Sequence, residues 1–240
     1  MTVAILTCSR MMARVHKVFL SIGLAALLVG GSIAILPPLL WGDHADYSHV
    51  VSIKDTRDYQ DPLLLEKAWA LPVAALYYPH IEFQRNVSLC GPASIVNVLH
   101  SLHQIGDQAT ILDGTGISTV LGYLPGGITL DQLAEIANQK VSRKVTVLRD
   151  MGLVEFREHL RLANDRSRRY VANFTRGPLF GAGGGHHSPI AGYLLEEDLV
   201  LILDVNEKYR PWLGKSERLY EAMNTVDAGA QKKRGLLLIE

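Results

Sequence analysis

The sequence predicts an α+β domain in which helices come mostly first and antiparallel strands mostly last, preceded by one N-terminal hydrophobic helix. Three observations favour this fold class. Apolar residues recur at helical spacing early in the chain, short apolar runs of strand length dominate the later part, and two of these runs are joined by a short acidic turn. A doubly wound parallel sheet would need strands and helices to alternate throughout, which they do not.

Length and composition agree with a globular domain. The chain has 240 residues, of which 48% are hydrophobic and 20% charged, and its formal net charge is zero. These values exclude a disordered chain, a collagen-like fibre and a polytopic membrane protein. The balanced charge gives no electrostatic reason to expect nucleic acid as a partner. A disulfide is not expected, because Cys8 lies in the N-terminal leader and Cys90 is the only other cysteine.

Residues 1–42 are predicted to target or anchor the chain. Their N-terminal end carries three basic residues and no acid, and residues 18–42 carry no charge. A helix over residues 18–36 would span roughly 28 Å at about 1.5 Å per residue, close to the core of a bilayer. The segment is either an uncleaved signal-anchor or a signal peptide cleaved near residues 32–34. Either way the domain at residues 43–240 is exported, anchored in the inner membrane facing the periplasm or free in the periplasm.

The first half of the domain is expected to be helical. An Asp-Pro pair provides the N-cap and the first position of a helix over residues 62–70. Residues 91–102 carry apolar side chains at helical spacing. After a loop at residues 104–128, rich in Gly, Asp and Thr, a Thr-x-x-Gln capping box opens a further helix at residue 129.

The second half is expected to supply the sheet. Strands are predicted at 145–148, 170–175 and 235–239, and helices at 153–163 and 216–226. Residues 189–195 and 199–205 are predicted to form a hairpin. If its turn lies at the short acidic segment between them, antiparallel pairing sets Asp204 opposite about Pro189. His186 and Asp204 would then lie at the same end of the hairpin.

Cys90 is placed like a nucleophile. A lone cysteine is more often a small buried hydrophobe, but this one ends a polar loop and directly precedes a helix. The positive end of the helix dipole stabilises a thiolate there. Gly91 would let a substrate backbone approach, and Pro92 suits the first helical turn. Gln84 lies six residues upstream and offers an amide donor that could join the backbone N–H groups in an oxyanion hole.

A base and its orienting group are expected from the hairpin. His186 follows a glycine-rich run and Asp204 ends an apolar strand, so an imidazole–carboxylate pair would complete a thiol-protease-like site with Cys90. His187 is expected to point to the opposite face, as a surface or structural histidine. Zinc is not favoured, because adjacent histidines on a strand diverge and no Cys-x-x-Cys or His-x-x-x-His spacing occurs.

Several pieces of the chain, in this order and spacing, resemble the phytochelatin synthases, also called glutathione γ-glutamylcysteinyltransferases, and particularly their short bacterial members. The pieces are Gln84 with Cys90-Gly91 and residues 93–96, Gly185-His186-His187-Ser188-Pro189, Asp204-Val205, residues 221–227 and Lys233-Arg234-Gly235. Each piece alone is weak, but the ordered set is specific. The resemblance covers about residues 61–239 and implies a papain-like cysteine protease fold.

The resemblance implies a two-step acyl transfer. Cys90 would attack the Cys–Gly carbonyl of glutathione, with Gln84 in the oxyanion hole. His186, oriented by Asp204, would protonate the departing glycine. The resulting γ-glutamylcysteinyl thioester would pass to water, giving γ-glutamylcysteine, or to a second glutathione, giving a phytochelatin.

The resemblance also implies the residues that hold the substrate. Arg176, Asp227, Arg234 and Gly185 match positions around the γ-glutamyl group, whose free ammonium and carboxylate need an acid and an arginine. One departure concerns the second substrate. Relatives commonly carry a basic residue where this chain has Glu207, so hydrolysis is expected to dominate over transfer to a second glutathione.

The implied partners are glutathione as donor and acceptor, the membrane through the N-terminal helix, and a second copy of the chain in a homodimer, but no nucleic acid. No tightly bound cofactor and no metal-ligating residue are expected. A heavy-metal ion such as cadmium or zinc would enter as the glutathione thiolate complex, in a metal-detoxification role. Two alternatives stay open: a papain-like peptidase of the double-glycine leader peptidase type, against which Asp227 and Arg234 speak, and a non-enzymatic, membrane-tethered binder of glutathione or metal thiolates.

Overall fold

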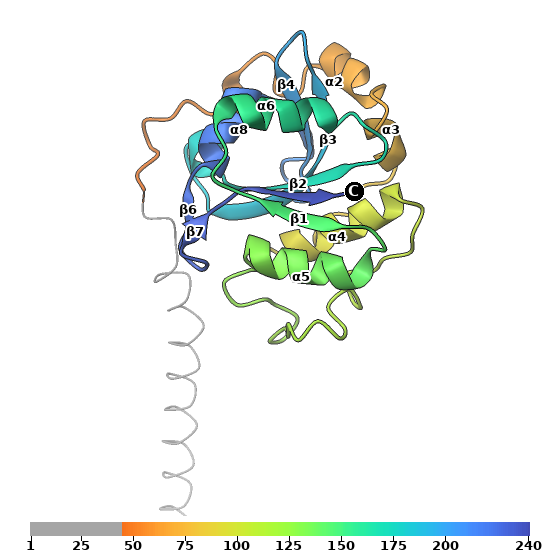
Figure 1. Ribbon diagram of the computed structural model, residues 1–240. Coiled ribbons are helices and arrows are strands. Elements are labelled where there is room, and N and C mark those ends of the chain that lie inside the picture. Colours follow the sequence, from red (N-terminus) through yellow and green to blue (C-terminus); the bar gives the residue numbers. More distant parts are fainter. Residues whose placement is uncertain (1–44) are drawn as a thin grey trace, which may run out of the picture. The chain divides into compact units, whose positions relative to one another are not determined.

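The computed structural model describes residues 45–240 (Figure 1). The signal-anchor or signal peptide expected at residues 1–42 lies outside the described residues. Within residues 45–240, none of the helices has the length and apolar character needed to cross a bilayer. The described chain is α+β, as predicted, with one large antiparallel sheet and helices packed on it.

Four α-helices precede the first strand, and three more are interleaved with the strands. The helices are η1 (Ile53–Asp55), α2 (Pro62–Trp69), α3 (Ala74–Tyr77), α4 (Cys90–Ser101), α5 (Leu130–Lys140), α6 (Leu153–Leu162), α7 (Gly177–Phe180) and α8 (Ser216–Met223). The strands are β1 (Val145–Leu148), β2 (Arg169–Thr175), β3 (Gly185–Leu194), β4 (Leu199–Leu203), β5 (Pro211–Lys215), β6 (Val226–Asp227), β7 (Lys232–Lys233) and β8 (Leu236–Ile239). The predicted helices-first order therefore holds for α2 to α5 only.

Two helix starts use the capping residues that the sequence predicts. The Asp61 carboxylate accepts the N–H groups of Leu63 and Leu64 at the start of α2. Thr129 and Gln132 form a reciprocal capping box at the start of α5. Both signals are local, because each joins residues at most three positions apart.

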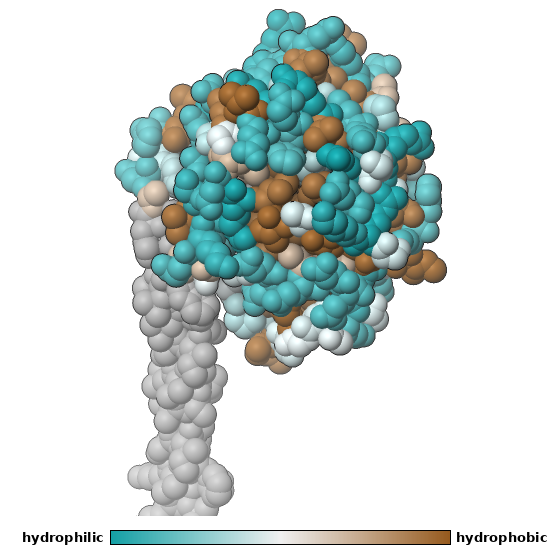
Figure 2. All heavy atoms as spheres, in the orientation of Figure 1, coloured by the Kyte–Doolittle hydropathy of each residue, from teal (hydrophilic) through white to brown (hydrophobic). Residues whose placement is uncertain are grey.

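The six-stranded sheet has the order β1-β8-β2-β3-β4-β5, and every neighbouring pair is antiparallel. The sequence did not predict β5, whose five residues include a proline and a glycine. It is an edge strand, where a proline does not interrupt the hydrogen-bond ladder. At the other edge of the sheet, the four residues of β1 are only partly buried. Figure 1 places β1 between α6 and α5, and Figure 2 shows apolar residues at the surface in that band.

A bulge in β3 changes its register with β4. The pairing shifts by one residue between Ile190 and Gly192. The regular pairing expected from sequence set Asp204 opposite about Pro189, whereas in the structure the residue after Asp204, Val205, donates its N–H to the Ser188 hydroxyl at 3.3 Å. The prediction that His186 and Asp204 meet at one end of the hairpin is confirmed by their contact.

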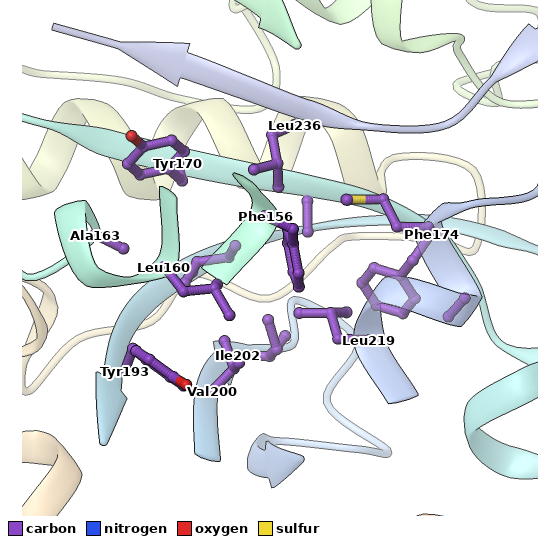
Figure 3. Close-up of a cluster of buried hydrophobic side chains, with 14 of the residues drawn as sticks. Phe156, Leu160, Ala163, Tyr170, Phe174, Tyr193, Val200, Ile202, Leu219 and Leu236 are labelled. Atoms are coloured by element: carbon purple, nitrogen blue, oxygen red, sulfur yellow. The ribbon is translucent and has the colours of Figure 1, made fainter. Parts of the chain in front are cut away.

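Each face of the sheet carries its own hydrophobic core. On one face, α6 and α8 pack over the central strands, and Figure 3 shows Phe156 and Leu160 from α6 converging with Phe174 and Leu219. On the other face, α4 and α5 pack over β2 and β8. Eleven of the twelve residues of α4 are buried, so its N-terminal residue, Cys90, is held in a fixed place beside β3.

Candidate active site

Cys90 is the first residue of α4 and is 6% exposed. Its carbonyl accepts the Ser94 hydroxyl at 2.7 Å, which ties the first turn of the helix together. Gly91 was expected to leave room for a substrate, but the structure gives it a packing role. A Cβ added there would lie 2.2 Å from Ile128 Cδ1 and 3.2 Å from Leu133 Cδ1, so glycine lets α4 approach the loop before α5.

Two histidines meet the Cys90 sulfur. His187 Nδ1 lies 3.8 Å from Cys90 Sγ, and the His186 side chain also interacts with the thiol. His187 was expected to point to the face of the strand opposite His186, as a surface or structural histidine, and the expectation of a surface position is wrong. His187 is 2% exposed and contacts the nucleophile, because α4 packs against β3 and brings Cys90 to the end of the strand where both rings reach it.

Asp204 is fully buried and receives four hydrogen bonds. His186 Nε2 lies 3.0 Å and Arg176 Nη2 2.8 Å from Oδ1, which also accepts the Asn206 N–H at 2.9 Å. Trp212 Nε1 donates to Oδ2 at 3.0 Å. Burial raises the pKa of the Asp204 carboxyl, but His186 and Arg176 outweigh burial and hold the pKa far below its usual range. The carboxylate therefore stays ionised and fixes the His186 ring.

Cys90 and His186 form an ion pair. Burial raises the pKa of the Cys90 thiol, yet the hydrogen bonds from His186 and His187 and the positive charge of His186 prevail and bring it well below the ordinary value. Burial lowers the pKa of His186, but the Asp204 charge, with the Cys90 contact, raises it above the ordinary value. A thiolate facing an imidazolium is the resting state that nucleophilic thiol chemistry needs.

Gln84 is docked next to the nucleophile. Its backbone N–H donates to the Val205 carbonyl at 2.7 Å, and Val205 packs against Cys90. The Gln84 amide donates to the Asn86 carbonyl at 2.9 Å, while its Oε1 is buried without a partner within residues 45–240. The loop thus brings Gln84 to the same end of β4 that carries Asp204.

Arg234 and Asp227 lie on one hairpin near the start of β3. A Cβ added to Gly185 would lie 3.3 Å from Arg234 Nη2, so the guanidinium is next to the residue before His186. Arg234 Nη1 donates to Thr225 Oγ1 and to the Val226 carbonyl, and its buried Nε has no partner in the described part of the chain. Asp227 follows Val226 in β6, so the acid and the arginine belong to the same hairpin.

Arg176 contacts the catalytic carboxylate, a contact that the resemblance did not imply, and its role in holding substrate stays a prediction. Its guanidinium is bonded to Asp204 and stacks 3.7 Å from the centroid of the Tyr209 ring, with the side chain only 7% exposed. Arg176 therefore supports the carboxylate from behind. Neither this role nor that of Trp212 could be read from the sequence, because both depend on side chains that meet only after β3, β4 and β5 pair.

In residues 45–240, no group of three or more His, Cys, Asp or Glu side chains is arranged to hold a metal ion. A cavity of about 510 Å³ is lined by residues between Tyr47 and Val51 together with Pro178, Arg218 and Glu221. None of the predicted catalytic or substrate-binding residues lines it.

Two solved structures are similar to this chain at low sequence identity. The peptidase domain of Streptococcus ComA, a bi-functional ABC transporter involved in a quorum sensing pathway, is 15% identical, with a TM-score of 0.46, and covers 66% of this chain and 96% of its own. A C39-like peptidase from Bacillus anthracis is 12% identical, with a TM-score of 0.49, and covers 69% and 96%. Likeness at this distance carries no conclusion about activity.

Sequence relatives are closer. Glutathione gamma-glutamylcysteinyltransferase 1 of Triticum aestivum is 35% identical over 116 residues, or 47% of this chain and 23% of that protein. Glutathione gamma-glutamylcysteinyltransferase of Schizosaccharomyces pombe is 31% identical over 117 residues, or 48% and 28%. The match thus spans about a quarter of these relatives' length. The family model of phytochelatin synthase matches residues 120–236, a segment that carries His186 and Asp204, so over this segment the chain is similar to the phytochelatin synthases.

Proposed function

We propose that the chain is a papain-like thiol acyltransferase that cleaves the Cys–Gly bond of glutathione. The observation that carries this proposal is the buried ion pair of Cys90 and His186, supported by an ionised Asp204. Such a pair is suited to acyl transfer through a covalent intermediate. The family match supports glutathione as the acyl donor.

In the first step, the Cys90 thiolate attacks the carbonyl carbon between cysteine and glycine of glutathione. The backbone N–H of Cys90, which has no acceptor within its own helix at this position, and the Gln84 amide would stabilise the oxyanion. His186 then gives its proton to the glycine nitrogen as the C–N bond breaks. The products are free glycine and a γ-glutamylcysteinyl thioester on Cys90.

In the second step, an acceptor attacks the thioester while neutral His186 takes its proton and the electron pair of the C–S bond returns to sulfur. Water as acceptor gives γ-glutamylcysteine, and the amine of a second glutathione gives a phytochelatin. Glu207 is exposed near the end of β4, three residues after Asp204. Its charge would repel the carboxylates of a second glutathione, so we propose that hydrolysis dominates.

The substrate's γ-glutamyl group offers one ammonium and one carboxylate. Asp227 and Arg234 supply the complementary charges from one hairpin, and Arg234 lies beside Gly185 at the start of the catalytic strand. This pairing supports selection of a γ-glutamyl group over an ordinary peptide N-terminus. We prefer glutathione to a leader peptide as substrate because the charges of Asp227 and Arg234 are complementary to the ammonium and the carboxylate of a γ-glutamyl group.

The thioester itself provides the test. Full-length protein is exposed briefly to glutathione, quenched in acid and examined by mass spectrometry. We expect a γ-glutamylcysteinyl adduct on the peptide that contains Cys90, and an amount of glycine equal to this adduct plus the γ-glutamylcysteine and phytochelatin formed. A Cys90→Ser variant, which keeps the size of the side chain, should form no thioester. A folded wild-type protein that neither forms the adduct nor releases glycine would overturn the proposal.

We further propose that the domain works outside the cytoplasm, tethered by or released from residues 1–42. The uncharged stretch at residues 18–42, preceded by basic residues, supports this location. A fusion of an export-dependent reporter enzyme to the C-terminus should be active, and fractionation should separate an anchored chain from a cleaved one. A fusion that is produced but whose export-dependent reporter stays inactive would contradict the proposal.

A further inference from the structure

A second imidazole contacts the nucleophile, and the mechanism above does not use it. His187 Nδ1 lies 3.8 Å from Cys90 Sγ. The side chain is 2% exposed, and its other ring nitrogen, Nε2, is buried with no hydrogen-bond partner in residues 45–240. Buried polar atoms in folded proteins nearly always have a hydrogen-bond partner. The unpaired Nε2 of His187, whose Nδ1 contacts the thiolate, therefore needs a physical explanation.

The surroundings of His187 differ from those of His186. His186 has the ionised Asp204 at 3.0 Å, which supports a positive ring. Around His187, α4 contributes Cys90, β2 contributes the neutral Asn173 directly across the ladder, and the guanidinium of Arg234 lies beside Gly185, two residues away. The thiolate is thus the anion that His187 contacts, and it is shared with His186.

The unpaired nitrogen fixes the position of the proton. A proton on Nε2 would leave a buried N–H donor without an acceptor, which folded proteins avoid. A proton on Nδ1 points toward the sulfur and leaves Nε2 as an unpaired acceptor. Burying an unpaired acceptor costs less free energy than burying an unpaired N–H donor. We infer that His187 is a neutral hydrogen-bond donor, Nδ1–H to the Cys90 thiolate, and that His186 carries the proton that moves. This inference rests on the proposed function only in taking Cys90 as the nucleophile.

The donor has a specific consequence for the two steps. In deacylation the C–S bond breaks and its electron pair returns to sulfur, so a fixed N–H aimed at that sulfur stabilises the developing charge. In acylation the same bond stabilises the attacking thiolate and reduces its nucleophilicity. Loss of the donor should therefore slow thioester breakdown more than thioester formation.

The thiolate can be titrated without any substrate. Iodoacetamide alkylation of the Cys90 peptide, measured by mass spectrometry across pH, reports the thiolate and separates it from Cys8. Compared with wild type, His187→Phe should raise the pH of half-maximal alkylation by about one unit, a tenfold change in the ionisation equilibrium. His187→Asn, which restores an N–H near the Nδ1 position, should recover part of that shift. An alkylation profile for His187→Phe equal to that of wild type overturns the inference.

A measurement on the unmodified protein covers the case in which the variants fail to fold. Nitrogen-15 NMR of the histidine rings distinguishes a proton on Nδ1, on Nε2 or on both. We expect His187 to be neutral with the proton on Nδ1 while His186 is doubly protonated. A His187 ring with its proton on Nε2, or on both nitrogens, overturns the inference. Both measurements omit glutathione, so they stay informative if the thioester test fails.

Discussion

The two faces of β3 treat neighbouring histidines differently. His186 packs edge-on against Phe174, with ring centroids 5.5 Å apart, and its Nε2 reaches the buried Asp204. His187, across the ladder from Asn173, has the Cys90 sulfur as its partner, and no hydrogen bond or ion pair joins it to a carboxylate of residues 45–240. Two residues of the same type, adjacent in the chain, thus receive different charge states. The Asp204 carboxylate raises the pKa of His186 while the nearby Arg176 cation lowers it, so the surroundings decide where the proton resides and the residue type does not.

The largest expected effect separates the two histidines. His186→Ala removes the group that protonates glycine and activates Cys90, so kcat for glycine release should fall by about 10⁶-fold, as when a triad histidine is removed. His187→Phe removes one donor and leaves the proton carrier, so its kcat should fall less, by about tenfold. Steady-state kinetics on both variants, with circular dichroism as the check on folding, test the contrast. Equal losses would mean that the two faces of β3 are equivalent.

The next largest effect is expected from a change at Asp204, the carboxylate that contacts His186. Asp204→Asn keeps the shape but removes the charge, so kcat should fall by about 10⁴-fold, as when a triad carboxylate is replaced by its amide. It also leaves Arg176 buried without an anion, and the free energy of unfolding should drop by about 3–5 kcal/mol. Urea unfolding measures the second effect.

A double variant separates stability from catalysis at this position. Adding Arg176→Met to Asp204→Asn removes the uncompensated cation, so stability should partly return while activity does not. Recovery of activity in the double variant would show that the Asp204 charge is dispensable for His186.

The pH profile of kcat/KM should show the ion pair directly. The Cys90 pKa is lowered, so the thiolate forms, and activity rises, at a pH below the usual range for a thiol. The His186 pKa is raised, so the imidazolium is lost, and activity falls, only above the usual histidine value. Activity should be highest between these limits. One ionisation near the ordinary thiol value, about 8.5, would contradict the ion pair.

The smallest expected effect concerns Glu207, which is not part of the Cys90–His186 ion pair. Glu207→Lys replaces an exposed negative charge by a positive one, so the ratio of phytochelatin to γ-glutamylcysteine should rise about two- to fivefold, the size of one exposed ionic contact. Product analysis with glutathione and cadmium measures the ratio, and Glu207→Gln is the matched control. Abundant oligomers beyond the dimer already in wild type would refute the expectation that hydrolysis dominates.

Much of the site could be predicted because its signals are local or follow from strand order. Cys90 at a helix start, and His186 and Asp204 at one end of a hairpin, need only helix and strand periodicity. The contacts of Arg176 and Trp212 with Asp204 could not be predicted. They join side chains from separate segments of the chain, and the edge strand that carries Trp212 has a weak strand pattern.

The sequence by itself determined where helices begin, as at Asp61 and Thr129, because a capping side chain bonds to backbone only two or three residues away. It also determined which residue types can form the ion pair. Only the tertiary structure decided that a bulge in β3 shifts its pairing with β4 and that His187 contacts the Cys90 sulfur. Register and burial are properties of the packed sheet, and one extra residue in a strand changes every pairing beyond it.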